Sequence, residues 1–451
     1  MKKRLSIVSM ACACALVLGL ASGCSNGGSG TGTSSAPAGQ SSGETAGSGE
    51  EIVIRYMTWE DGDWQNFTQE FINKYMEENP GIKIQYEPTA GSEYMPKLQS
   101  ALASNNEPDV MWVDQWVPLF QNDMFEDLKP LAEAQGYDLS AHNEEHLKMA
   151  TYNDKLYGLT GWAGVVGVIY NKELFDQAGV AYPEYGWTWD ECYKAAEKIT
   201  QGEGAEKIYG ISMPASDFNS IENILWNGDA YIIDDELNYD AVLNSDKMVE
   251  AFEWFASFTK NGLSPEPSSL DALGGDEEMF KQGKIGMIFK TSGYIASVES
   301  SGGFDMENMG TVCLPVKEED MTPAVNTLLT NPICLSKNSQ HKEEAFKFLT
   351  ARVGKETQTD FCSRGWTMPN DPEIVEDLGL MDDPLYATYG DTIVNTDKYV
   401  YPKGTFAYSP MSTELSDNLF NCLTNVYLEN ADVKTELDNA VEQVKKAEEN
   451  K

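Results

Sequence analysis

Between residues 52 and 113, short apolar runs alternate with helical patterns, and this alternation restricts the fold more than any other feature of the sequence. Residues 52–57 are apolar and rich in β-branched side chains, which is typical of a buried strand. Aromatic residues three or four apart then predict a helix ending near residue 79, and strands are expected at 82–86 and 110–113 with a helix between them. This order is that of a doubly wound α/β sheet.

The length of the chain predicts more than one such unit. It has 451 residues, of which 41% are hydrophobic, whereas a single core rarely grows past about 250 to 300 residues. We therefore expect two α/β domains. Apolar residues at helical spacing from Val433 to Val444 predict a final helix that packs back onto one of them.

The N-terminus has the pattern of an export signal. Residues 2–4 are basic, residues 5–20 are uncharged, and small residues lead to Cys24, so residues 1–23 are expected to be a signal peptide. The uncharged run is shorter than the roughly 20 apolar residues that a spanning helix needs. The residues before Cys24 resemble a bacterial lipobox, which predicts a lipoprotein acylated, as with palmitate, at Cys24. Ala21 replaces the commoner Leu, and a plain secretory signal is the alternative.

Residues 24–50 are expected to form the lipidated cysteine and a flexible tether. After Cys24 they are almost entirely Gly, Ser, Thr and Ala, with no aromatic or large aliphatic side chain, and such a tract buries too little apolar surface to order itself. Two acyl chains on one cysteine give stable membrane anchoring. We therefore predict an exported protein held at the outer face of the cytoplasmic membrane by its lipid alone.

Charge and cysteine spacing exclude several function classes. The formal net charge is −40, and so negative a field repels nucleic acid and anionic membranes. Beyond Cys24, the cysteines lie far apart without a CxxC pair, so neither a zinc ribbon nor a thioredoxin-like motif is present. They are expected to be small buried hydrophobes, with one disulfide among them left open. These cysteines are Cys192, Cys313, Cys334, Cys362 and Cys422.

Several short motifs occur in the order of a known family. Glu-Asn-Pro-Gly at 78–81 and Glu-Pro-Asp-Val at 107–110 precede a segment at 157–171 that has the form of a crossover. Trp-Thr-Trp-Asp-Glu at 187–191 and Phe-Lys-Gln-Gly-Lys-Ile-Gly-Met-Ile-Phe at 280–289 follow, then Leu314-Pro315 and residues 343–349. Over residues 52–370 the chain resembles extracellular solute-binding protein family 1, the binding proteins of sugar ABC importers, similar in organisation to maltose-binding protein.

The resemblance implies an α/β fold of two lobes joined by hinge crossovers, with a ligand cleft between the lobes. Lobe one would comprise residues 51–161 plus 316–350, and lobe two residues 162–315 plus 351–451. It also implies a monomeric, non-enzymatic binding protein without cofactor, which captures a mono- or oligosaccharide and delivers it to the permease subunits of an ABC transporter.

Aromatic side chains are the first candidates for ligand contact. Sugar rings present apolar C–H faces that pack on flat aromatic surfaces, and ligands of open α/β sheets lie beyond the carboxyl ends of the strands. Tryptophans in expected loops or at strand ends therefore either contact the ligand or serve ordinary packing. They are Trp59, Trp116, Trp162, Trp226 and Trp366.

Polar candidates follow the same logic. Charged groups near the strand ends can bind sugar hydroxyls through charge-assisted hydrogen bonds. Ser292 and Gly293 follow an expected strand at 285–289, and the glycine would let a ligand approach the backbone closely, although a simple turn accounts for the same pair. The charged candidates are Glu60, Asp114, Asp229 and Arg364.

Two other function classes stay open at this point. His142 and His146 fit the pattern H-x-x-E-H, in which two histidines bind zinc, but a third ligand is not evident and a solvated helix face gives the same spacing. Paired carboxylates of the glycosidase kind occur by chance in a chain with 72 acidic residues. A surface hydrolase, or a binding protein for a cationic solute such as a polyamine, is therefore the alternative; we expect no metal and no catalytic residue.

Overall fold

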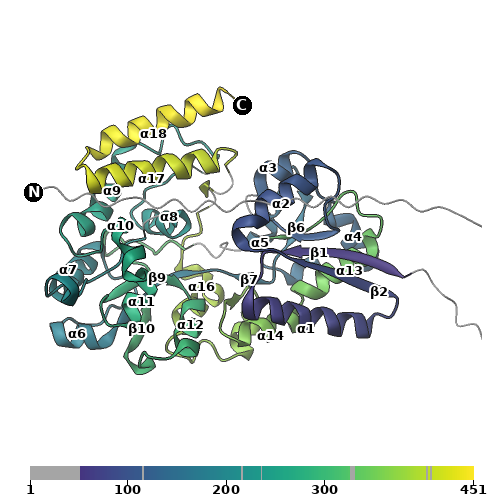
Figure 1. Cartoon of the computed structure of the whole chain (residues 1–451), viewed down its shortest axis with the longest axis horizontal. Coiled ribbons are helices and arrows are strands. Elements are labelled where there is room, and N and C mark those ends of the chain that lie inside the picture. The colour runs from purple at the N-terminus through teal and green to yellow at the C-terminus, as the bar shows by residue number, and fades with distance from the viewer. Residues whose placement is uncertain are drawn as a thin grey trace, which may run out of the picture. The chain divides into compact units, whose positions relative to one another are not determined.

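The computed structural model describes residues 51–113, 116–214, 217–234, 236–325, 331–402, 405–406 and 409–450. These residues belong to one compact unit, Gly49–Lys451. The expected signal peptide, the acylated Cys24 and the tether lie outside the described residues. We call lobe one the part of the chain around a five-stranded sheet, and lobe two the part around a three-stranded sheet (Figure 1).

Lobe one is built on a sheet with strand order β2-β1-β3-β11-β6. The strand β1 pairs in parallel with β2 and β3, as the alternating pattern predicts, and helix α1 runs beside these strands (Figure 1). β11 is antiparallel to both β3 and β6. The bounds are β1 Ile52–Thr58, α1 Gly62–Glu78, β2 Ile82–Pro88, α2 Gly91–Ala103, β3 Val110–Trp112, β6 Gly158–Leu159 and β11 Ile333–Leu335.

Further helices and a hairpin cover this sheet. Helix α13 contacts β11 and β6, and its Phe346 and Leu349 are fully buried in the same apolar cluster as the strands. Val353 and Phe361, at the end of α13 and in α14, also belong to that cluster. The bounds are α3 Trp116–Gln121, α4 Leu128–Gln135, α5 Glu144–Met149, β4 Thr151–Tyr152, β5 Lys155–Leu156, α13 Lys342–Val353 and α14 Lys355–Ser363.

Lobe two has the strand order β10-β8-β9, all antiparallel. The central strand β8 is buried at every position, which explains its nearly continuous apolar sequence. Helix α7 begins with a capping box between Thr188 and Glu191, at the motif noted in the sequence. The bounds are β8 Val166–Asn171, α6 Lys172–Ala178, α7 Trp189–Ile199, α8 Phe218–Trp226, α9 Asp246–Lys260, α10 Pro267–Leu270, α11 Gly275–Lys281, β9 Met287–Thr291, α12 Gly293–Ser301 and β10 Met309–Val312.

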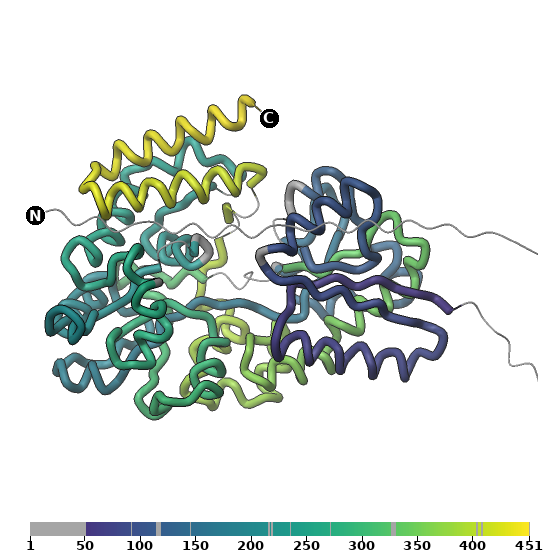
Figure 2. Tube along the Cα trace, in the orientation of Figure 1, coloured from purple at the N-terminus to yellow at the C-terminus, as the bar shows by residue number. Residues whose placement is uncertain are grey.

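The C-terminal part of the chain also packs in lobe two. Helices α17 and α18 lie side by side and both contact α9 (Figure 2). Val433 to Val444 supply the buried face of α18, which confirms the final helix expected from their spacing. The bounds are α15 Pro372–Asp377, α16 Ala387–Val394, α17 Ser412–Leu428 and α18 Val433–Glu448.

The chain passes between the two sheets more than once. The first crossover leads from β6 through β7 (Trp162–Ala163) to β8, and a later one leads from α14 through β12 (Met368–Pro369) to α15. These two crossing segments pair with each other, β7 antiparallel to β12. Later in the chain, the Val325 N–H donates to the Val400 carbonyl of lobe two, and the Pro332 carbonyl accepts from the Val113 N–H of lobe one.

Two sequence-level questions are answered by burial. All five cysteines beyond the N-terminal segment are buried free thiols, so none of them forms a disulfide with another. Within the part of the chain that the structure describes, no helix is both long and apolar enough to cross a membrane.

Candidate functional site

Three of the candidate tryptophans meet in one aromatic cluster of lobe one and the crossovers. The ring centroid of Trp112 lies 5.0 Å from that of Trp162 and 5.6 Å from that of Trp59, and Trp64 lies 6.3 Å from Trp366. Trp162 is only 6% exposed, whereas Trp59 and Trp366 are partly buried. Trp59 and Trp366 therefore keep surface that a ligand can contact, while Trp162 mainly packs.

Glu60 is occupied by protein partners. Its carboxylate pairs with Arg352 at 3.1 Å, and neither side chain is exposed. The hydroxyl of Tyr86 donates to its other oxygen at 2.7 Å. A ligand hydroxyl would have to displace one of these bonds, so the immediate role of Glu60 is within the fold.

Gly293, Arg364 and Trp366 lie together beside the later crossover. A Cβ atom on Gly293 would come within 2.3 Å of the Trp366 carbonyl oxygen, so the close approach expected at this glycine is made by protein backbone. The Arg364 guanidinium lies 5.4 Å from the Trp366 ring and pairs with Asp360 at 3.5 Å. Ser292, directly before α12, is buried.

The remaining candidates are on other elements. Trp226 ends α8 and is 2% exposed. Asp229 follows it in a left-handed turn and forms an ion pair with Lys247 at the surface. Trp116 begins α3, but its side chain is outside the described set, and Asp114 lies outside the described residues altogether.

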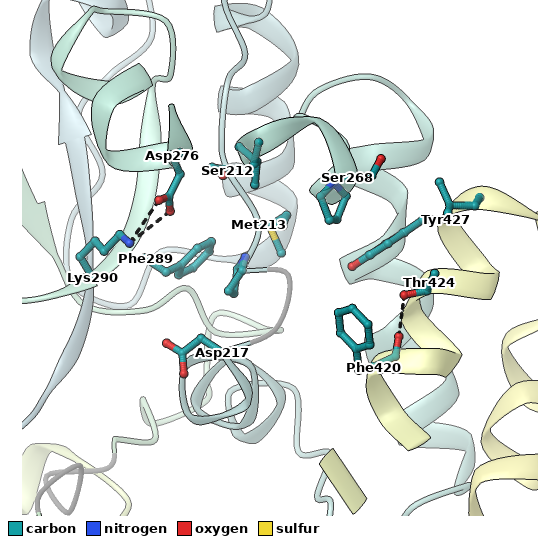
Figure 3. Close-up of a pocket in the computed structure, with 15 residues that line it drawn as sticks. Ser212, Met213, Asp217, Ser268, Asp276, Phe289, Lys290, Phe420, Thr424 and Tyr427 are labelled. Atoms are coloured by element: carbon teal, nitrogen blue, oxygen red, sulfur yellow. Dashed lines mark hydrogen bonds and ion pairs between the residues drawn. The ribbon is translucent and has the colours of Figure 1, made fainter. Parts of the chain in front are cut away.

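A pocket that the sequence did not indicate lies in lobe two (Figure 3). Its volume is about 500 Å³, which falls within the range of roughly 300 to 1,000 Å³ typical of small-molecule sites. Four separate stretches of chain form its wall: the segment after Gly210, the helices α10 and α11, the end of β9, and α17. Its lining residues are Ser212, Met213, Pro214, Asp217, Pro267, Ser268, Leu270, Gly275, Asp276, Phe289, Lys290, Phe420, Thr424, Tyr427 and Leu428.

The pocket combines aromatic faces with a few polar groups. Phe289, Phe420 and Tyr427 supply aromatic surface, and Phe420 is 41% exposed. The Ser212 hydroxyl is buried behind the pocket wall and has no hydrogen-bond partner among the described residues, whereas Ser268 and Thr424 add further polar side chains to the lining. Such a mixture of flat apolar surface and fixed polar atoms suits a ring that carries hydroxyls.

The charged groups of this pocket are paired with each other or with the fold. The Lys290 ammonium lies 3.3 Å from the Asp276 carboxylate and 3.0 Å from that of Glu277. Burial disfavours the charged lysine, but these two carboxylates outweigh burial and hold the Lys290 pKa above its usual value. Asp217 accepts from Ser220 as the N-cap of α8. The pocket therefore offers no isolated charge on these side chains.

Both histidines of the H-x-x-E-H pattern have hydrogen-bond partners within the protein. His142 Nε2 lies 2.8 Å from the Tyr137 hydroxyl, and His146 Nδ1 lies 3.0 Å from Asn370 Nδ2. Both histidines are buried, and burial lowers the His142 pKa. Among the described residues, no group of three or more potential metal ligands occurs. The pattern therefore receives no support as a zinc site.

Two α/β lobes joined by paired crossing segments, with an aromatic and polar pocket in one lobe, are the features expected of a two-lobed solute-binding protein. The family of bacterial extracellular solute-binding proteins matches residues 70–388 of the chain. Because this match covers more than half of its length, the chain belongs to that family.

Individual relatives agree with this assignment. The diacetylchitobiose binding protein DasA of Streptomyces coelicolor is 23% identical over 344 residues, which cover 75% of this chain and 78% of that protein. The ABC substrate-binding protein Lmo0181 of Listeria monocytogenes, solved with cycloalternan, superposes with a TM-score of 0.73 at 22% identity and covers 88% of this chain and 99% of its own. UgpB of Mycobacterium tuberculosis, solved with glycerophosphocholine, gives 0.74 at 18%, with 88% and 98% covered. The predicted two-lobed α/β fold is confirmed by these matches.

Proposed function

We propose that this chain is the substrate-binding component of an ABC importer and captures a mono- or oligosaccharide. The observation that carries the proposal is the pocket of lobe two, because Phe289, Phe420 and Tyr427 give it aromatic walls and Ser268 and Thr424 add polar side chains to its lining. Sugar-binding relatives support the same ligand class, as the names of DasA and the cycloalternan-bound Lmo0181 indicate.

Capture would involve both lobes. A ligand held on the lobe-two pocket shifts the molecule toward a closed form when lobe one contributes a second surface, since the ligand then makes contacts that the open form lacks. The partly buried Trp59 and Trp366 are the residues we assign to that second surface. In this proposal lobe one comprises residues 51–161 plus about 332–363, because Val353 and Phe361 belong to its apolar cluster. Lobe two comprises residues 162–325 plus about 368–450, because Val316 bonds to Trp187 and Val325 bonds to Val400. The last two boundaries differ from those expected from the sequence.

Transport is the remaining part of the proposal. The mature protein is exported, monomeric and attached to the outer face of the cytoplasmic membrane through an acylated Cys24. Its closed form hands the sugar to the permease subunits. The protein performs no catalysis in this scheme, which accords with a family of binding proteins.

A cationic ligand fits the pocket less well. Asp276 is engaged by Lys290, and Asp217 caps a helix, so a polyamine would have to break existing interactions before it gained new ones. The pairing also leaves the polar side of the pocket suited to uncharged hydroxyls.

A thermal-shift screen tests the ligand class directly. A ligand that binds only the folded protein raises the melting temperature by mass action, and titration calorimetry then gives the affinity. We expect a neutral glycan to bind, whereas spermidine and glycerophosphocholine, as charged comparators, should not. If a charged comparator binds and no glycan does, the proposed ligand class is wrong.

A further inference from the structure

Arg352 is buried in lobe one with an incomplete set of hydrogen bonds. It is 1% exposed near the end of α13. Its Nη2 donates to Glu60 at 3.1 Å, but its Nε and Nη1 have no hydrogen-bond partner among the described residues. Withdrawal of two charges from water is costly, and apolar residues of similar size often serve stability as well. Stability alone therefore does not account for this pair.

Aromatic rings surround the Arg352 guanidinium. Its central carbon lies 5.0 Å from the centroid of the Trp162 ring, and this is the shortest of five such distances. A cation above an aromatic face is attracted more strongly when both are withdrawn from water. The other rings are those of Phe361 at 5.5 Å, Phe67 at 5.6 Å, and Phe71 and Trp112 at 5.9 Å.

Two of the residues that contact Arg352 lie in or beside segments of the proposed hinge and binding site. Trp162 is the first residue of β7 in the first crossover, and Glu60 directly follows Trp59. Gly161, just before Trp162, is packed tightly as well, because an added Cβ would lie 3.1 Å from both Gln358 Cγ and Val353 Cα. The crossover is thus fixed to lobe one as far as Trp162.

We propose that Arg352 is a positioning residue for the hinge. Its guanidinium holds Trp162 against lobe one, so that the first crossover bends beyond Trp162, and its bond to Glu60 fixes the loop that carries Trp59. The inference rests on the proposed function only in its consequence for ligand affinity. The mechanical part concerns the unliganded protein and has its own measurement.

Hydrogen exchange without ligand tests the mechanical part. The variant Glu60→Gln with Arg352→Met removes both buried charges together, which preserves folding better than removal of one. The matched control, Arg55→Met with Glu87→Gln, removes a partly exposed Arg–Glu pair with a distance of 2.8 Å elsewhere in lobe one. We expect exchange at residues 162–166 to accelerate about tenfold in the first variant and to stay unchanged in the control.

Several outcomes decide the inference. Unchanged exchange at 162–166 would overturn it, because Arg352 would then not hold Trp162 in place. An equal acceleration over the whole lobe would also overturn it, because the variant would then be destabilised in general. Should the double variant fail to fold, Arg352→Lys keeps a charge beside Glu60 but loses the planar group, and the same local acceleration is expected.

A measurement of ligand affinity distinguishes failure of this inference from failure of the proposed function. With a glycan identified for the parent protein, calorimetry should show a weaker affinity for the double variant and an intermediate one for Arg352→Lys. Affinity equal to that of the parent would refute the coupling to Trp59. If the parent binds no glycan, the proposed function fails while the exchange result still decides the role of Arg352.

Discussion

The carbonyl oxygen of Trp366 occupies the space that a side chain on Gly293 would need, since an added Cβ atom would lie 2.3 Å from it. Gly293 begins α12 of lobe two, and Trp366 leads into the β12 strand of the later crossover. The contact therefore joins a lobe-two helix to a hinge segment through backbone atoms. No flexible side chain can yield at this point.

Gly293→Ala should consequently shift α12 or the crossover. Overpacking of this kind costs about 1 to 3 kcal/mol of folding free energy, and displacement of Trp366 should also weaken glycan binding. Gly91→Ala is the control, because no atom lies within 4 Å of its added Cβ. Thermal unfolding and calorimetry measure both effects. Equal melting temperatures for the two variants would show that the contact tolerates a methyl group.

Phe420→Ala tests the lobe-two pocket. Phe420 is 41% exposed on α17, so its removal should barely lower the melting temperature, whereas loss of an aromatic ligand contact typically costs about 1 to 2 kcal/mol of binding free energy. Tyr182→Ala is the control, since Tyr182 is also an aromatic residue of lobe two with 41% exposure but is not part of the pocket lining. Unchanged glycan affinity for Phe420→Ala would remove the pocket from the proposed site.

The sequence predicted the parallel strands of lobe one because their signals are local. Residues 52–57, 82–86 and 110–113 each carry their own apolar pattern, and the helices between them end at turn residues. The final helix, Val433–Glu448, was predictable for the same reason. The pairing of β11 between β3 and β6 joins segments far apart in the chain, and no local pattern specifies it.

The candidate site was less predictable than the fold. The loop tryptophans stay candidates for ligand contact. Sequence position does not show whether an indole is covered by distant residues, and Trp162 is 6% exposed while Trp366 is only partly buried. The pocket is lined from four distant stretches, including Phe420 and Tyr427 on α17. Their spacing of seven residues places both on one helix face, which was the only signal available in advance.

Trp226→Ala and Trp366→Ala should separate packing from ligand contact. Trp226 is 2% exposed, so its truncation should cost about 3 to 5 kcal/mol of folding stability. Trp366 is partly buried and should lose less stability and more glycan affinity. Unfolding of the ligand-free variants and calorimetry below their melting temperatures give the two quantities. A Trp226 variant that keeps its stability and loses affinity would reverse this assignment.

Cys24→Ala tests attachment. Without the acylated cysteine, the protein should appear in soluble fractions, because a lipid at this residue is the only anchor we propose. Glycan affinity should not change, since the tether separates the anchor from the folded lobes. Fractionation and calorimetry provide the measurements. A variant that is processed normally and stays with the membrane would require another means of attachment.

The buried carboxyl of Glu222 makes folding stability decrease as the pH rises, which is the opposite of the usual effect of a carboxyl group. Glu222 lies on α8 with no exposed surface, and it accepts hydrogen bonds from the Phe406 N–H at 2.8 Å and the Thr405 hydroxyl at 2.5 Å. Burial raises its pKa from 4.5 to about 8, in spite of these two bonds. Between these values the folded protein holds a proton that the unfolded chain has released.

Stability should therefore fall as the pH rises through this interval. The contribution is complete below about pH 4.5, decreases toward pH 8 and is absent above it, with a slope of up to about 1.4 kcal/mol per pH unit. Glu222→Gln cannot titrate, so the difference in unfolding free energy between parent and variant should change by at least about 1 kcal/mol from pH 5 to pH 8. Denaturant unfolding at several pH values measures this difference, in which all other titrating groups cancel. Parallel profiles for the two proteins would mean that the Glu222 carboxyl is ionised in the folded state at neutral pH.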